Sequence, residues 1–141
     1  MNLWQDREFA EKLLKEHTKS DSLIKHALSV EAAMRAMARH FGEDEMAWGM
    51  VGLLHDLDYE AHPDEHCKYT PGLLREAGYD EVFVRAVLSH GYGLCTDVEP
   101  LTDMEKSVFA VDELTGLVLA CVYVRPSRSI MDLELKSVRK K

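Results

Sequence analysis

The sequence predicts an all-α protein, a single-domain bundle of about six or seven helices. Apolar residues recur at helical spacing through most of the chain, and capping residues or glycine and proline stop signals separate the segments. No segment shows a convincing strand pattern, although the β-branched Val118, Val122 and Val124 weaken the end of one helix. A length of 141 residues is typical of one domain, so we expect a single unit over 1–141.

The first three helices follow from their apolar stripes and caps. Residues 6–16 are amphipathic, and Ser20 is a suitable N-cap for a second helix that ends at Gly42 and carries His26 on its apolar face. A third helix, rich in apolar residues on nearly every side, should end near Leu54 and lie at the centre of the bundle.

Two glycines inside this third helix predict a close helix–helix contact. Gly49 and Gly52 each cost about 1 kcal/mol relative to alanine in an exposed helix. Close approach of a neighbouring backbone would explain them, and the helix that carries His26 is the candidate neighbour.

The second half of the chain alternates loops and helices. Thr102 and Glu105 form a capping box for the sixth helix, and Pro126 ends that helix. The expected elements are a loop at 57–65, helices at 66–77 and 81–90, a loop at 91–100, a helix at 103–124 and a basic helix at 129–141. The domain core then spans roughly 20–124, and the absence of a stop signal leaves open whether the chain continues past Lys141.

Composition and charge indicate where in the cell we expect the protein and which classes of partner it can bind. Residues with apolar side chains make up 46% of the chain, yet we find no apolar stretch near the roughly 18 to 20 residues of a membrane span. The acidic N-terminus lacks signal-peptide features, so we expect a cytoplasmic protein without a membrane partner. A net charge of -8 argues against a long nucleic acid and favours a small-molecule substrate. The basic residues of 125–141 form either a solvated helix or a tail that binds phosphate or a partner.

The three cysteines give no indication of a cross-link or of a thiolate metal site. Cys67, Cys95 and Cys121 are far apart and form no CxxC pair. We therefore expect buried or inert thiols.

Six residues that can bind a metal stand at places where helices could direct them inward. They are His26, His55, Asp56, His66, His90 and Asp112. Each could separately be an ordinary core or surface residue, and Asp112 could lie on a solvent-facing side of its helix. A carboxylate inside an apolar helix is nevertheless costly unless a cation pairs with it.

The adjacent pair His55-Asp56 can share one metal only under a geometric condition. On a regular helix the two side chains diverge by about 100°. They converge best where the helix ends, and a helix C-terminus also favours a cation. Imidazole and carboxylate ligands suit one or two divalent ions such as Mn, Fe, Zn, Ni or Co, with Mg also considered.

These residues resemble the HD-domain metal-dependent phosphohydrolases, named for a His...His-Asp...Asp pattern. That pattern stands here as His26, His55-Asp56 and Asp112, within segments KHALSVEAAMR, VGLLHDLDYE, AVLSHGY and FAVDELTGL over roughly 20–120. The resemblance implies an HD-like helical fold in which these four residues hold a first metal. In the dinuclear branch, Asp56 would bridge to a second metal held by His66 and His90, although Thr70-Pro71-Gly72 departs from the family's small residues.

The activity that the resemblance implies is hydrolysis of a small phosphate ester, a nucleotide or related metabolite, by a metal-bound water. The chain lacks the lysine that many relatives carry soon after the His-Asp pair. In addition to Asp56 as a catalytic residue, the candidates for the general acid are Asp58, Glu60, His62 and Lys68. Additional phosphate contacts could come from Lys68, Arg75, Arg125 or Arg128.

Two other functions stay open. Some relatives with the same six ligands hold two irons and oxidise substrates with dioxygen, and ligand identity alone does not separate them. The second alternative is a non-catalytic helical signalling module whose metal only stabilises the fold.

Overall fold

The computed structural model describes residues 2–124, 127 and 130–139, and this part of the chain is all-α, as predicted. Its α-helices are α1 (Arg7–His17), α2 (Asp21–Phe41), α3 (Glu45–Leu53), α4 (Thr70–Ala77), α5 (Glu81–Ser89), α6 (Asp103–Val124) and α7 (Leu135–Arg139). Short 3₁₀ helices occupy Leu3–Gln5, Pro63–Glu65 and Ile130–Asp132. Aspartates cap three of these helices: Asp6, Asp44 and Asp80 accept backbone N–H bonds at the starts of α1, α3 and α5.

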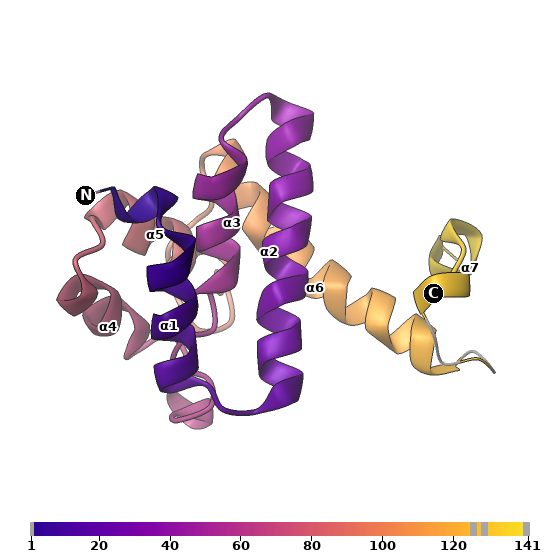
Figure 1. Cartoon of the computed structure of the whole chain (residues 1–141), viewed down its shortest axis with the longest axis horizontal. Coiled ribbons are helices and arrows are strands. Elements are labelled where there is room, and N and C mark those ends of the chain that lie inside the picture. The colour runs from indigo at the N-terminus through magenta and orange to yellow at the C-terminus, as the bar shows by residue number, and fades with distance from the viewer. Residues whose placement is uncertain (1, 125–126, 128–129, 140–141) are drawn as a thin grey trace.

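Helix α3 is the centre of the bundle, as its composition predicts. It contacts α1, α2, α5 and α6, and residues 48–53 are all buried. Figure 1 shows α3 between α1 and α2, with α6 passing behind α2 and extending away from the bundle. The functional residues described below come from the ends and faces of these packed helices.

The glycines of α3 allow α2 to approach closely. A Cβ at Gly52 would lie 2.8 Å from the carbonyl oxygen of Val30, and a Cβ at Gly49 would lie 2.9 Å from Nε of Arg35. The expected backbone contact with the His26 helix is therefore confirmed at Gly52, whereas Gly49 meets a flexible side chain.

We expect Gly52→Ala to lower the free energy of unfolding by about 1–3 kcal/mol, the range for overpacked cores. The new methyl group would force α2 and α3 apart, because the atom it meets belongs to the Val30 backbone. Gly49→Ala is the matched comparison, since the Arg35 side chain can move. Urea unfolding of both variants measures the difference, and equal stability of the two would contradict this reading of the contact.

Two element boundaries and one cap differ from the prediction. Helix α4 begins at Thr70 rather than at residue 66, because Cys67 adopts a left-handed backbone with φ 76° and Pro71 occupies the first turn. Ser20 makes no side-chain cap bond. The predicted basic helix 129–141 is reduced to Leu135–Arg139, and residues 129, 140 and 141 lie outside the described part.

Helix α6 corrects the expectation about apolar length. By length and composition alone, Asp103–Val124 is long and apolar enough to cross a membrane. An 18-residue stretch of this helix has a mean hydropathy of 1.7, and 28% of that stretch is buried. Its first half packs in the bundle through Val108 and Val111, and its second half exposes apolar side chains such as Leu119 and Tyr123. The charged Asp112 lies between these halves.

Candidate metal centre

Four polar side chains from three separate regions meet at one point. His26 comes from α2, His55 and Asp56 follow α3, and Asp112 comes from α6. The Nε2 atom of His26 lies 3.0 Å from Oδ1 of Asp112 and 3.1 Å from Nε2 of His55. The Nε2 atom of His55 lies 3.1 Å from the same Asp112 oxygen. We call this group, His26, His55, Asp56 and Asp112, the first cluster; its ligand atoms all lie within 4.8 Å of one another.

The end of α3 lets the adjacent residues His55 and Asp56 point to the same centre. The helix ends at Leu53, and the turn that follows no longer keeps the side chains at helical angles. The Nε2 atom of His55 consequently lies 3.2 Å from Oδ2 of Asp56. This convergence at the helix end is the geometry expected if the two adjacent residues share one metal.

Asp56 also belongs to a second cluster, formed with His66 and His90. Its other oxygen, Oδ1, lies 3.0 Å from Nε2 of His66 and 3.4 Å from Nε2 of His90. The two imidazole Nε2 atoms are 3.1 Å apart. One carboxylate thus faces the first cluster with Oδ2 and the second cluster with Oδ1, which is the position of a bridging ligand.

Hydrogen bonds on the far side of the His55 and His90 rings fix how these rings present their nitrogens. Nδ1 of His55 lies 2.7 Å from the Gly52 carbonyl oxygen, and Nδ1 of His90 lies 2.5 Å from the Val87 carbonyl oxygen. Because a carbonyl only accepts, each Nδ1 carries the proton and donates it. The Nε2 lone pairs therefore face the cluster centres, as in metal sites where an outer partner orients the ligand.

The carboxylates of both clusters favour positive charge on the groups next to them. Hydrogen bonds with Asp112 and Asp56 raise the pKa of His26 from 6.5 to about 9. Burial opposes the charged form of His66, but Asp56 and Asp58 outweigh it and raise its pKa to about 9. In the absence of a metal, protons take the place of the cation. Imidazole nitrogens and carboxylate oxygens are a donor set suited to borderline divalent metals.

We expect the metal-free protein to lose stability as pH rises from 6.5 to beyond 9. The folded-state pKa values of His26 and His66 exceed the unfolded value, so their stabilising contribution is complete below 6.5 and disappears as pH passes through about 9. Thermal unfolding in the presence of a chelator measures this slope. With saturating Mn²⁺ the same pH change should lower the stability less, because the cation replaces the protons. A metal-free protein that gains stability over this pH range would contradict the prediction.

Asp58 holds the second cluster in place from outside. Its Oδ1 lies 2.7 Å from Nδ1 of His66, and its Oδ2 accepts N–H bonds of 3.0 Å from Tyr69 and Thr70 at the start of α4. Although burial favours the neutral acid, these bonds lower its pKa to about 2. This carboxylate positions His66 and binds the backbone at the start of α4. A role for Asp58 as the general acid stays a prediction.

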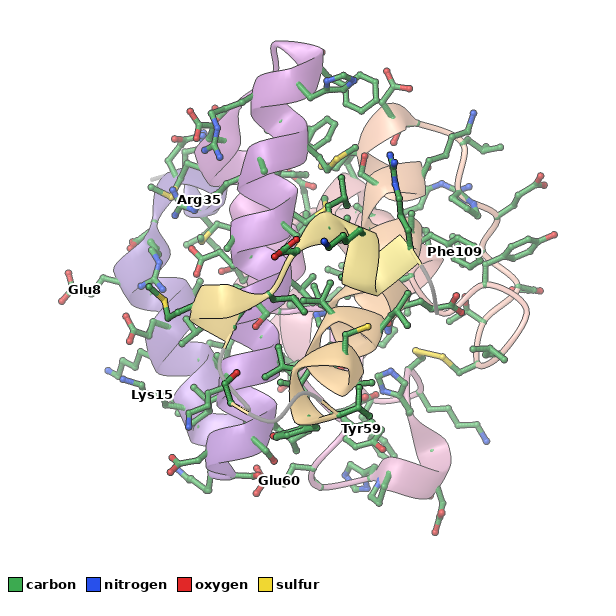
Figure 2. The ribbon with its side chains drawn as sticks, turned by 90° about the vertical axis from the view of Figure 1, so that its right-hand side faces the viewer. Glu8, Lys15, Arg35, Tyr59, Glu60 and Phe109 are labelled. Carbon is green, nitrogen blue, oxygen red and sulfur yellow. A yellow bond between two sulfur atoms is a disulfide. The ribbon has the colours of Figure 1, made fainter. Side chains whose placement is uncertain are left out.

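The other general-acid candidates lie in different surroundings. Glu60 accepts N–H bonds from Lys19 and Ser20 and stands at the lower edge of Figure 2, beside the start of α2. It therefore anchors the α1–α2 connection. A role for Glu60 as the general acid stays a prediction. His62 stacks on Tyr69 with ring centroids 3.7 Å apart.

Lys68 remains beside the clusters. It lines, together with His66 and Cys95, a pocket of about 700 Å³. Of the proposed phosphate-binding arginines, Arg75 pairs with Glu81 at the surface, and Arg125 and Arg128 lie outside the described residues.

The expectation of three unpaired thiols was wrong for two of them. Cys67 and Cys95 form a disulfide, with Cα atoms 6.0 Å apart, and Cys121 is free and buried. The separation of 28 residues hides this pairing in the sequence, because the contact arises only when the loop before α4 meets the loop after α5. The role of Asp58 was missed because its partners His66, Tyr69 and Thr70 follow only after an intervening loop.

Comparison with known proteins agrees with the geometry. No solved structure matches the chain significantly. The family model of the HD domain matches residues 23–117, a range that contains both clusters and more than half of the chain. The chain therefore belongs to the HD domain family, a metal-dependent hydrolase-like family.

Proposed function

We propose that this protein is a metal-dependent phosphohydrolase that acts on a small phosphate ester, a nucleotide or a related phosphorylated metabolite. The observation that carries the proposal is the position of Asp56, whose two oxygens face two adjacent histidine clusters. Two divalent ions at such sites would lower the pKa of water and stabilise charge on the oxygens of a phosphoryl group.

The residues of the chain have separate tasks in this proposal. His26, His55, Asp56 and Asp112 would hold the first ion, and Asp56, His66 and His90 the second. Asp58 keeps His66 in its orientation. Lys68 lines the pocket beside the second cluster, where its ammonium group would bind a phosphate oxygen or supply a proton to the leaving group.

The size and charge of the surroundings support a small substrate. The pocket of about 700 Å³ also contains the acidic Asp64 and Asp97 on its wall. Acidic walls and a net charge of -8 disfavour a long polyanion. A cytoplasmic setting without a membrane partner completes the proposal.

The test begins with protein purified without chelator. Metal content is measured by mass spectrometry, and the metal-free protein is reloaded in turn with Mn, Fe, Zn, Ni, Co and Mg. Each form is assayed for phosphate release against a panel of nucleotides and phosphoesters. We expect turnover that depends on metal and disappears in Asp56→Ala. Absence of metal-dependent release across the panel would reject the proposal, and consumption of dioxygen by the iron form would instead favour a di-iron oxygenase.

A further inference from the structure

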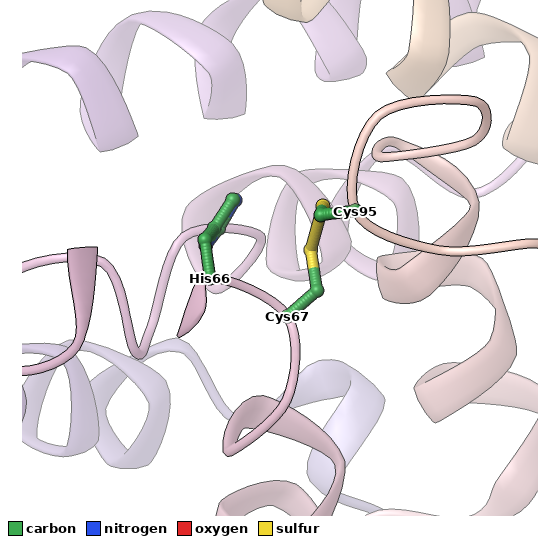
Figure 3. A group of neighbouring side chains, drawn as sticks. All are labelled: His66, Cys67 and Cys95. Atoms are coloured by element: carbon green, nitrogen blue, oxygen red, sulfur yellow. A yellow bond between two sulfur atoms is a disulfide. The ribbon is translucent and has the colours of Figure 1, made fainter. Parts of the chain in front are cut away.

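The Cys67–Cys95 pair lies between the two backbone segments that carry the second cluster. Cys67 directly follows His66 along the chain, and Gly91 directly follows His90. A Cβ at Gly91 would collide with Sγ of Cys95 and lie 3.1 Å from Sγ of Cys67. The two sulfur atoms therefore pack against the backbone beside His90, and one of them belongs to Cys67, the residue that follows His66 (Figure 3).

One end of this bridge is firmly attached to α5. The amide of Cys95 donates to the Gly91 carbonyl oxygen at 2.9 Å, and the Thr96 hydroxyl donates to the Leu88 carbonyl oxygen at 2.9 Å. The turn that carries Cys95 is consequently folded onto the end of the helix. Any movement of Cys95 is thereby coupled to the segment that carries His90.

The other end belongs to a segment with little regular structure. Cys67 is the one non-glycine residue with positive φ in the described part of the chain. Its neighbour His66 is oriented by Asp58, but no helix ladder fixes the backbone between residue 66 and the start of α4 at Thr70. The sulfur bridge is the covalent connection that holds this segment against α5.

His66 does not act as a third ligand beside the sulfurs. Its Nε2 atom faces Asp56 and His90, and its Nδ1 atom binds Asp58. One nitrogen of His66 lies within 4.8 Å of both sulfur atoms, but a metal bound by these three residues would take that nitrogen from its present partner. Pairing of the two sulfurs with each other is the arrangement that leaves the cluster intact.

We propose that Cys67 and Cys95 form a reversible disulfide, and that its oxidation state sets how tightly Asp56, His66 and His90 hold a metal ion. The oxidised bridge fixes His66 relative to His90; the reduced thiols release the His66 segment and weaken this site. The inference rests on the proposed function for its metal, and it concerns regulation of that same site.

The thiol–disulfide exchange needs a small-molecule disulfide to oxidise the pair and a small-molecule thiol to reduce it. In oxidation, one cysteine thiolate attacks the small disulfide, a mixed disulfide forms and one small thiol leaves. The second cysteine thiolate then attacks the protein sulfur, and the second small thiol leaves. The protein loses two electrons, the small disulfide gains them, and the two thiol protons pass to the released thiols. Cys95 is half-buried on the wall of the pocket, so it is the sulfur that a small thiol reaches.

The experiment uses the full chain with Cys121→Ser as the background, which leaves only the pair of interest. One sample is equilibrated with oxidised glutathione and another with a phosphine reductant, and both are desalted without oxygen. Alkylation after denaturation counts free thiols, and calorimetry measures the affinity for each Mn²⁺. We expect no free thiols in the oxidised sample and two in the reduced one. We also expect about tenfold weaker binding of one Mn²⁺ after reduction, of the size seen when a ligand loses an outer partner.

A variant with both Cys67→Ser and Cys95→Ser should match the reduced sample and should not respond to either reagent, because in this background it has no thiol left to oxidise. Two free thiols after oxidised glutathione, or identical Mn²⁺ affinities in both redox states, would overturn the inference while leaving the proposed function intact. A redox-dependent Mn²⁺ affinity without any phosphoester turnover would support the inference and count against the proposed function. A cobalt-loaded reduced sample with a thiolate-to-cobalt absorption band would also overturn it, because the thiols would then be ligands.

Discussion

Asp56→Ala is expected to abolish binding of both metal ions and to reduce metal-dependent turnover by at least about 10³-fold. The loss should exceed the 10- to 100-fold effect typical of removing an outer partner of a ligand, because this carboxylate contributes one oxygen to each cluster. Its pKa lies far below the ordinary value; burial opposes ionisation, but His55, His26 and His66 outweigh burial. The negative charge is thus present at every working pH.

The measurements for this variant are metal stoichiometry, phosphate release and circular dichroism. Asp56→Asn is the informative companion, since it keeps the shape and removes the charge. We expect it to lose both ions as well. Retention of two ions by either variant, with the helical spectrum unchanged, would mean that Asp56 does not bridge the clusters.

The second large effect is expected for Asp112→Ala. This change removes the carboxylate that lies 3.0 Å from His26 and 3.1 Å from His55, so the first cluster should lose its ion. The second cluster does not use Asp112 and should keep its ion. Turnover should fall by about 10²–10³-fold, the range for loss of a group that stabilises developing charge.

The neighbouring Glu113 is a matched control, because it is exposed on the same helix. Glu113→Ala should retain both ions and full turnover. Alanine is a good helix former, so neither variant should disturb α6. An Asp112→Ala protein that still binds two ions would show that the first cluster holds its metal without the α6 carboxylate.

The sequence allowed the helices to be predicted because their signals are local. Apolar spacing, the aspartate caps and the Thr102–Glu105 capping box lie within a few residues of one another, and the structure contains the box with bonds of 3.1 Å in each direction. The convergence of His26, His55, Asp56 and Asp112 was expected from the resemblance of these segments to the HD-domain family. Their role as metal ligands stays a prediction.

The remaining features depend on contacts between distant segments. The Cys67–Cys95 pair forms only after two loops meet. The bonds of Glu60 to the backbone of Lys19 and Ser20 were not predicted because these partners are about forty positions away. Helix α4 starts late because the left-handed backbone of Cys67 interrupts the helix, and residue type alone does not signal this conformation.

The carbonyl acceptors of His55 and His90 have a consequence for how such a centre arises. Each acceptor, on Gly52 or Val87, belongs to the residue three positions earlier in the same chain segment. A histidine at the end of a helix is thus oriented by a backbone carbonyl of the same segment, and no second side chain is needed to orient it. His66 depends instead on Asp58, so a protein engineer could graft the other two ligands onto a new bundle singly but would have to transplant His66 together with its aspartate.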